Sequence, residues 1–404
     1  MLRFLTAGES HGPALTVILE GVPAGLALSA SDIDRDLARR QLGYGRGRRM
    51  AIEHDRVEIL SGVRHGETIG SPLTLVIRNR DWVNWQYTMS IEADPRADLP
   101  GARRGPVTRP RPGHADLAGA LKFQRDDMRD ILERASARET AARVAAGAVA
   151  RTLLTALGMT VVSHVTEIGG AAVADPMAYD FATVAALTDE DGVRCADAAI
   201  GAAMRAAVDA AREAGDTVGG TFEIIAHSVP VGLGSHTQWD RKLDGLLAQA
   251  LMSIQAIKAV GIGRGPDVSH LPGSRVHDEI LRAGDAPTGT LSALRRPTNR
   301  AGGLEGGITN GEDVRVSAWM KPISTLMSPL RSVNISTMEE EPATIERSDV
   351  CAVPAAAVVG EAMVCLVLAN AVLEKFGGDS LGELSRASRA WQLTVQLRLG
   401  KDAD

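Results

Sequence analysis

The segment Ser136–Gly158, SARETAARVAAGAVARTLLTALG, decides the fold because it holds the clearest helix signal in the sequence. It opens with a capping box, in which Ser136 is the N-cap and Glu139 follows three residues later. Glycine commonly ends a helix, so Gly158 marks the other end. The apolar residues between them step by threes and fours along one face: Ala141, Val144, Ala145, Ala148, Val149, Leu153, Ala156 and Leu157. We predict an amphipathic helix from Ser136 to Leu157.

Three other helices are predicted around this segment. One runs from Asp240 to about Val260, and another starts with Pro354 near its first turn and ends at Gly377-Gly378. A shorter helix is capped by Ser31 or Asp32 and ends near Gln41. The face of the Asp240 helix is formed by Leu243, Leu247, Leu251, Ile254 and Ile257.

Strand-like runs lie between these helices. They are Leu2–Thr6, Ala14–Leu19, Val57–Ser61, Leu73–Ile77, Thr221–Val229 and Val314–Lys321. Residues 79–113 carry five prolines and look like one long irregular stretch, which is typical of functional or disordered segments. No Ser/Gly-rich or Pro-rich linker divides the chain. We therefore expect one α+β domain over residues 1–404, with helices packed on antiparallel sheets.

Composition and charge narrow the class of protein. The chain has 404 residues with 45% hydrophobic residues and a net charge of −6. These values are ordinary for a globular protein and exclude disorder and collagen-like repeats. An acidic balance disfavours nucleic-acid binding. No apolar run is expected to reach the ~18 residues of a membrane span, so no membrane association is expected. Three cysteines without metal or disulfide spacing indicate reduced thiols and a cytoplasmic protein.

Arginines cluster in glycine- and proline-rich loops although the chain is acidic. Six lie within residues 35–49 and four within residues 103–111, and Arg134 and Arg138 flank the capping box. Because the guanidinium fork matches phosphate and carboxylate geometry, the clusters indicate a pocket for a small polyanion. Solvated surface charge and an RNA-binding face stay open as alternatives, although aromatic residues for base stacking are scarce nearby.

Two histidines stand in loops suited to proton transfer. Gly8-Glu9-Ser10-His11-Gly12 formally matches the nucleophile elbow G-x-S-x-G, but an elbow needs a helix after it, and a strand-like run follows here. His11 is therefore the better candidate, as a general acid or base. His114 lies in the Pro-Gly turn Arg111–Asp116, where a structural role is the alternative. Neither histidine has the third ligand or cysteine that a zinc site needs, so no metal is expected.

A glycine-rich loop precedes a cationic segment. Residues 301–311 contain two Gly-Gly pairs but lack the Gly-Lys-Ser/Thr ending of a P-loop, so a flexible turn and a cofactor cradle both remain open. Lys321-Pro322-Ile323-Ser324-Thr325 then supplies a cation and two hydroxyl groups.

Taken in order, six segments make the chain resemble the chorismate synthase family. They are Gly8–Gly12, Gly45–Met50, Arg111–Asp116, Ser136–Thr140, Asn299–Gly303 with Gly306-Gly307, and Lys321–Thr325. The resemblance implies a homotetrameric β-α-β sandwich, with antiparallel sheets and helices packed outside, that binds reduced FMN. It implies the anti-1,4 elimination of phosphate from 5-enolpyruvylshikimate 3-phosphate to give chorismate, the last step of the shikimate pathway toward the aromatic amino acids.

The same resemblance assigns roles to individual residues. His11 would protonate the departing phosphate, His114 would act on the reduced flavin, and Asp349 would manage the proton on flavin N5. The implied substrate-binding residues are Ser10, Arg40, Arg46, Arg49, Arg138 and Arg347. The implied FMN-binding residues are Arg134, Ala135, Ser136, Gln255, Ala256, Gly306, Lys321, Pro322, Ile323, Ser324, Thr325 and Arg347.

Other functions and the source of electrons are left for experiment. A serine hydrolase using Ser10 predicts labelling by an active-site phosphonate, and a non-catalytic anion- or RNA-binding protein predicts steep salt dependence without flavin affinity. Whether the chain reduces its own flavin with NADPH is not readable from the sequence. Its length leaves little room for an added reductase module, so a separate flavin reductant is expected.

Overall fold

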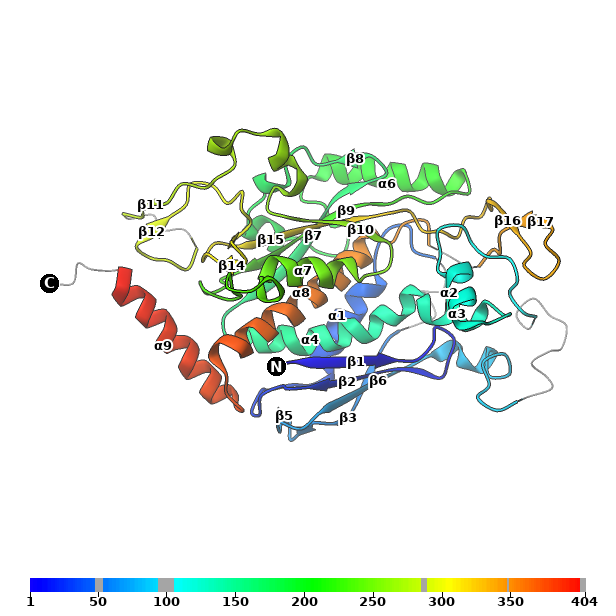
Figure 1. The fold of residues 1–404 in the computed structure, drawn as a ribbon, viewed down its shortest axis with the longest axis horizontal. Coiled ribbons are helices and arrows are strands. Elements are labelled where there is room, and N and C mark those ends of the chain that lie inside the picture. Colours follow the sequence, from blue (N-terminus) through cyan, green and yellow to red (C-terminus); the bar gives the residue numbers. More distant parts are fainter. Residues whose placement is uncertain (48–53, 94–104, 285–288, 347–348, 400–404) are drawn as a thin grey trace.

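Two antiparallel sheets enclose a layer of helices in this computed structural model, which describes residues 1–47, 54–93, 105–284, 289–346 and 349–399 (Figure 1). The first sheet, in spatial order, is β1 Arg3–Ala7, β2 Ala14–Glu20, β6 Leu73–Arg78 and β3 Val57–Ser61. The second is β10 Ile257–Ile262, β15 Val314–Met320, β9 Gly220–His227, β7 Thr160–Ile168 and β8 Ala171–Ala172. All pairings in both sheets are antiparallel.

The helical layer consists of α1 Ala30–Gln41, α4 Thr140–Ala156, α7 Leu243–Met252 and α8 Val353–Phe376. Helix α4 packs on β2 and β6 of the first sheet, whereas α8 packs on β7 and β9 of the second. The two helices also pack on each other, and a Cβ placed on Gly147 would lie only 2.3 Å from the Cβ of Ala362. The Ala- and Gly-rich sequence of α4 therefore allows this close approach.

The α+β class and the β-α-β sandwich are confirmed. Helix α6 Ala198–Glu213 packs on β7 and β8 of the second sheet, on the side away from the central helices (Figure 1). The short helix α5 Phe181–Ala185 also contacts β7.

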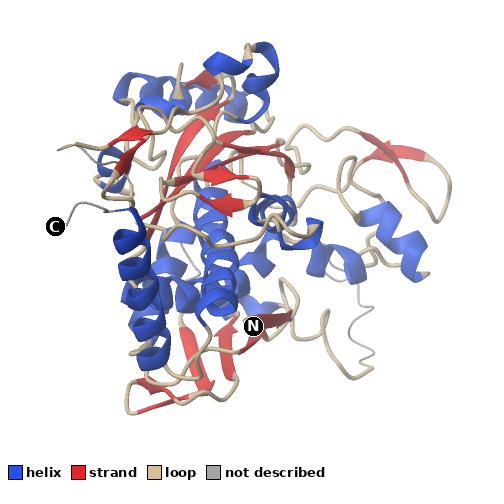
Figure 2. Ribbon diagram, turned by 60° about the vertical axis from the view of Figure 1, so that its left-hand side comes forward, coloured by secondary structure: helices blue, strands red, loops and turns tan. Residues whose placement is uncertain are grey.

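Smaller elements lie at the two ends of the sandwich. Helices α2 Asp116–Phe123 and α3 Arg129–Ala135 lie at one end with the hairpin of β16 Arg331–Val333 and β17 Glu340–Pro342, and α9 Leu381–Leu399 lies at the other (Figures 1 and 2). The remaining short strand pairs are β4 Val63–Arg64 with β5 Glu67–Thr68, β11 Leu281–Arg282 with β12 Leu294–Arg295, and β13 Leu304–Glu305 with β14 Ile308–Thr309.

The capping predictions were partly wrong. Ser29, not Ser31 or Asp32, is the N-cap of α1. Asp32 is the N3 residue that forms the capping box with Ser29. Ser136 does act as an N-cap, but of a 3-10 turn at Ala137–Glu139 that precedes α4. Its hydroxyl accepts a hydrogen bond from the backbone N–H of Arg138. The carboxylate of Glu139 accepts hydrogen bonds from the side chains of Thr6 and Arg143.

The predicted helix from Asp240 to Val260 is also too long. Helix α7 ends at Met252, and Ile257 opens strand β10, where it pairs with Met320 of β15. The run Ile257–Ile262 is rich in β-branched residues, which favour a pleated sheet. The helical periodicity of Leu243–Leu251 therefore does not continue into Ile257–Ile262, which forms a strand.

The expectation that no apolar run approaches membrane length is wrong for helix α8. Val353–Phe376 is long and apolar enough to cross a membrane by length and composition. In the folded chain, however, 89% of its apolar window is buried. Its position between the helices and the second sheet explains the apolar sequence as that of a core helix.

Candidate active site

The loop between β1 and β2 presents Ser10 and His11. Gly8 turns the chain with a φ of +104°, and a Cβ there would lie 2.3 Å from the carbonyl oxygen of Ala14. The position therefore requires glycine. Nδ1 of His11 lies 2.9 and 3.0 Å from the two carboxylate oxygens of Glu133 on α3.

Ser10, in the same loop, is buried. Its hydroxyl accepts a hydrogen bond from the Ser136 hydroxyl at 3.2 Å, and its backbone N–H donates to the Glu133 carbonyl. Strand β2 follows the loop, where a nucleophile elbow requires a helix. The arrangement thus disfavours the serine hydrolase alternative.

Two of the predicted substrate-binding arginines share one buried carboxylate. Asp55 accepts two bonds from Nη1 of Arg138, at 2.6 and 2.7 Å, and one from Nη2 of Arg40 at 2.7 Å. Burial by itself would raise the pKa of Asp55, but the two arginines outweigh it and lower that pKa. Among the described residues, two cations share this one anion, which leaves a local excess of positive charge in that part of the chain.

Asn79 connects this arginine pair to the His11 loop. Its Oδ1 accepts from Nε and Nη2 of Arg138, and its Nδ2 donates to the carbonyl groups of Glu9 and Gly12. Arg138, Asp55 and the loop that carries His11 therefore form one network of hydrogen bonds.

Arg46 and Asp349 join the same positive region. Nη1 of Arg46 donates to Asp349 at 2.6 Å, and the backbone N–H of Gly47 donates to its other oxygen at 2.7 Å. Burial lowers the pKa of Arg40. The charge of Asp55 opposes this shift, whereas the charges of Arg138 and Arg46 lower the pKa further. Arg46 thus adds its charge to that of the Arg40–Arg138 pair.

The residues described here fit an anionic ligand. Nε of Arg40 and both Nε and Nη1 of Arg129 are buried donors with no hydrogen-bond acceptor among the described residues. Oε1 of Gln255 is likewise a buried acceptor without a donor in that part of the chain. Buried polar groups are usually satisfied, so the arginine donors are suited to bind phosphate or carboxylate, and the Gln255 oxygen is suited to an N–H group such as that of a flavin.

His114 is held by its own buried carboxylate. Nδ1 of His114 lies 2.5 Å from Asp116, which also accepts from Nε of Arg111 at 2.8 Å. Burial would raise the pKa of Asp116, yet the hydrogen bonds from His114 and Arg111 outweigh it and lower that pKa. Arg111 also donates to the hydroxyl of Thr325, which ties the turn to the segment Lys321–Thr325.

The predicted cofactor-binding residues largely come together in the chain. The backbone N–H of Lys321 donates to the Ala256 carbonyl, and a Cβ on Gly113 would lie 3.6 Å from Nζ of Lys321. Burial and the charge of Lys258 lower the pKa of Lys321. Pro322, Ile323 and Ser324 continue this segment after β15.

Glu139 connects Gln255 to Arg134. It accepts from Nε2 of Gln255 at 3.3 Å and lies 3.7 Å from Nη2 of Arg134. Arg134 also donates to the carbonyl groups of Thr6 and Gly8, beside the His11 loop. Ala135 and Ser136 follow directly at the end of α3.

The remaining predicted residues are Arg49, Arg347 and Gly306. Arg49 and Arg347 lie outside the described residues. Gly306 lies in the β13–β14 hairpin, which receives the N-terminus of α7 through the bond from Leu243 N–H to the Gly307 carbonyl. Gln255 follows the other end of α7. The ten residues of this helix span about 15 Å at 1.5 Å each.

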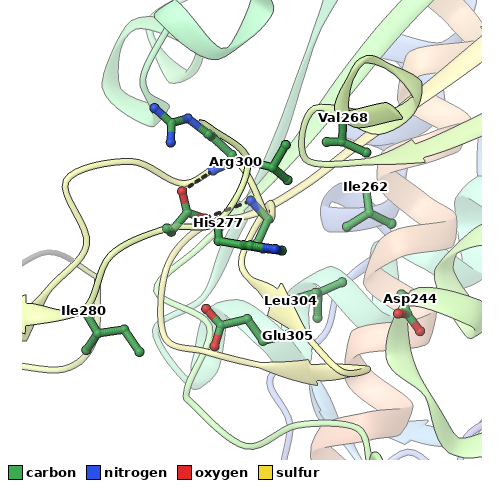
Figure 3. A pocket seen from close by; sticks show the side chains of 11 residues that line it. Asp244, Ile262, Val268, His277, Ile280, Arg300, Leu304 and Glu305 are labelled. Carbon is green, nitrogen blue, oxygen red and sulfur yellow. Dashed lines mark hydrogen bonds between the residues drawn. The ribbon is translucent and has the colours of Figure 1, made fainter. Parts of the chain in front are cut away.

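A separate cavity of about 440 Å³ lies beside Gly306 (Figure 3). His277, Arg300, Leu304 and Glu305 are among its lining residues, and the backbone N–H of Arg300 donates to Asp278. The glycine-rich loop thus forms a wall of a cavity within this chain, and no contact described here connects it to Lys321.

Sequence reasoning missed four residues that organise the site. Asp55, Asn79, Trp85 and Glu133 carry no motif of their own, and each acts on residues distant in the sequence.

The fold and the site together define an α+β enzyme of the sandwich type, with arginines to bind a small polyanion and histidines to transfer protons. A sequence model of the family described as "Chorismate synthase" matches residues 2–373. The chain belongs to the chorismate synthase family.

Individual relatives agree over the full length. The chorismate synthase of Geobacter sulfurreducens is 59% identical over 387 residues, covering 96% of this chain and 97% of the relative. That of Moorella thermoacetica is 57% identical over 397 residues, covering 98% and 100%. A solved structure described as "Crystal Structure of Chorismate Synthase" is 41% identical, covers 98% of both chains and has a TM-score of 0.77.

Family membership fixes the reaction. The chain is a carbon–oxygen lyase acting on phosphates that converts 5-enolpyruvylshikimate 3-phosphate to chorismate and phosphate. This is the last step of the shikimate pathway and serves aromatic amino acid biosynthesis. The family needs a reduced flavin for it.

Proposed function

We propose that this chain catalyses the elimination with reduced FMN and that His11 is the acid for the departing phosphate. His114 and Asp349 act on the flavin side. Ser10, Arg40, Arg46, Arg49, Arg138 and Arg347 bind the substrate. Arg134, Ala135, Ser136, Gln255, Ala256, Gly306, Lys321, Pro322, Ile323, Ser324, Thr325 and Arg347 bind FMN. The observation that carries the proposal is that two histidines, each bound to a buried carboxylate, belong to a site with excess arginine charge.

The chain's own residues account for binding and proton transfer. The substrate carries one phosphate and two carboxylates, so the cation excess at Arg40 and Arg138 offsets charge that would otherwise be desolvated without a partner. His11, held by Glu133, donates a proton to the leaving phosphate oxygen as the carbon–oxygen bond breaks. When bound, the reduced flavin supplies the electron density that assists this loss.

Asp349 is suited to a proton-accepting role beside the flavin. Its two carboxylate oxygens accept from Nη1 of Arg46 and from the backbone N–H of Gly47, which hold the carboxylate in one orientation. The alternative is that Asp349 only orders the Arg46 loop as an ion-pair partner. A role as helix cap is disfavoured, since α8 begins at Val353 with Ala352 as N-cap.

The assembly and surroundings of the enzyme form a second part of the proposal. We infer a single-domain protomer in a homotetramer, located in the cytoplasm, with reduced flavin supplied by a separate reductant instead of NADPH acting on this chain. These inferences rest on the family resemblance. Light scattering on the purified protein tests the tetramer, and turnover with NADPH and FMN alone tests the reductant.

Anaerobic turnover tests the proposal directly. The protein is mixed with FMN, dithionite and 5-enolpyruvylshikimate 3-phosphate, and released phosphate is measured against a control without dithionite. His11→Ala should keep flavin affinity while turnover falls by about 10²–10⁴-fold, the usual contribution of a general acid. Near-wild-type turnover in folded His11→Ala would remove His11 from the mechanism.

A further inference from the structure

The Glu133 carboxylate forms hydrogen bonds with both the backbone and the ring of His11. The backbone N–H of His11 donates to Oε2 of Glu133 at 2.8 Å, while Nδ1 of the ring lies 2.9 Å from Oε1 and 3.0 Å from Oε2. The carboxylate is completely buried, at 0% side-chain exposure. Its own backbone carbonyl accepts from Ser10, so α3 and the loop are joined at consecutive residues.

Trp85 restrains the other direction of ring movement. Its ring stacks on His11 with centroids 3.8 Å apart and an interplanar angle of 22°. The indole is itself fixed, because Nε1 donates to Asp81 at 3.0 Å. Arg129 packs against the same indole at 5.4 Å and lies 3.7 Å from Oε1 of Glu133. The histidine ring is thus held in its plane by Glu133 and across its plane by Trp85.

Only a carboxylate satisfies this geometry. Two N–H groups of His11 point at the two oxygens of Glu133, and an ionised carboxylate is an acceptor at both. An amide would present one acceptor and one donor, so one His11 N–H would face another N–H group. Glu133 therefore keeps a proton on Nδ1, so the proton that His11 gives to the phosphate is the Nε2 proton of the imidazolium, and the ring is left as the Nδ1–H tautomer.

We propose that Glu133 is a positioning residue for the elimination, setting the tautomer and orientation of His11, with Trp85 as the platform for the ring. The inference rests on the proposed acid role of His11. The logic is that of a carboxylate that orients a catalytic histidine without itself becoming protonated.

A matched control exists elsewhere in the fold. Nδ1 of His227 lies 2.7 Å from Asp313, and its ring stacks on Phe181 with centroids 4.1 Å apart. Asp313 precedes β15 and Lys321 follows it, so this pair lies about 24 Å from the lysine for seven residues at 3.4 Å each. A histidine between a carboxylate and an aromatic ring, with a more exposed pair at 42% and 24% side-chain exposure, thus stands at the other end of β15 from Lys321.

The test compares Glu133→Gln with Asp313→Asn under anaerobic turnover. Glu133→Gln should lower kcat by about 10²–10⁴-fold with KM changed less than about threefold, since the acid is misoriented while the arginines still bind substrate. Asp313→Asn should keep wild-type kcat. Glu133→Asp, which retains the charge but withdraws it by one methylene, should give a kcat between those of wild type and Glu133→Gln.

Nitrogen-15 NMR of the histidine rings supplies a readout that a merely structural role would not move. The His11 signal, assigned by its loss in His11→Ala, should show a protonated Nδ1 in the wild-type protein and a changed tautomer in folded Glu133→Gln. An unchanged tautomer overturns the inference.

The outcomes separate this inference from the proposed function. Wild-type turnover in His11→Ala means that the acid assignment itself fails. Reduced turnover in His11→Ala with wild-type kcat in folded Glu133→Gln means that only the role of Glu133 fails. If Glu133→Gln does not fold, Glu133→Asp decides, and a wild-type kcat there overturns the inference.

Discussion

Asp55 and Glu361 are both buried carboxylates that receive two arginines, yet their surroundings differ in charge. Glu361 on α8 accepts from Arg39 at 2.7 and 3.0 Å and from Arg151 at 2.6 Å. Asp55 accepts from Arg40 and Arg138 at comparable distances. The first cluster lies between helices and sheet, and the second lies at the candidate active site.

The Glu361 cluster is balanced. Asp36 accepts from Arg151, and Asp189 accepts from both Arg39 and Arg194, so three arginines are hydrogen-bonded to three carboxylates. The more exposed Arg35 adds only an ion pair with Asp36 at 3.6 Å. The Ser163 hydroxyl adds a further donor to Glu361. The helices α1, α4 and α8 are thereby joined to strand β7.

The Asp55 cluster is not balanced within the ranges that the structure describes. Its two arginines share one carboxylate, and Nε of Arg40 is buried without an acceptor among the described residues. Arginine thus serves two purposes in one chain. Where carboxylates match the arginines the cluster holds helices together, and where arginines exceed them the cluster is ready for an anion.

Glu361→Gln would break the balanced cluster and should have the largest effect on stability. It removes the charge that two arginines share, and breaking a buried ion pair typically costs about 3–5 kcal/mol. Turnover per folded molecule should be preserved. Urea unfolding followed by circular dichroism measures the loss, with Glu374→Gln as control, because the Arg241–Glu374 pair is about half exposed and such pairs contribute only about 0–1 kcal/mol.

Arg138→Lys sharpens the comparison on the side of ligand binding. A lysine keeps the charge but not the fork that contacts Asp55 and Asn79, so the arrangement offered to the substrate is lost. Charged hydrogen bonds contribute about 1.5–3 kcal/mol, which predicts a KM higher by roughly 10–100-fold. Arg151→Lys in the balanced cluster is the matched control and should lower the melting temperature while leaving KM unchanged. Equal KM values for the two variants would contradict the distinction.

The fold was more accessible from sequence than the site. Strand β3 was predicted at its observed bounds, and α8 was predicted from Pro354 and Gly377, because those signals are local. Glu133 binds a residue 122 positions away, and Asp55 binds Arg138 across 83 positions. No local pattern marks a single acidic residue as the partner of a distant side chain. The motif resemblance supplied the histidines and arginines, but not the carboxylates that hold them.

Acidification should give the smallest and most gradual effect. Burial alone would raise the pKa of Glu361, but Arg39 and Arg151 outweigh it and lower that pKa below the ordinary value of 4.5. A carboxyl group with a lowered pKa in the folded state stabilises the protein above its unfolded pKa, and this contribution is lost as pH falls toward the folded value. One such group can change the free energy of unfolding by at most about 1.4 kcal/mol per pH unit. Between pH 4.5 and 3.5, the wild-type protein should therefore lose stability more steeply than Glu361→Gln, by no more than that amount. Urea unfolding at each pH gives both slopes. Identical slopes would show that the charge of Glu361 does not stabilise the balanced cluster, and the contrast with Asp55 would then rest on ligand binding alone.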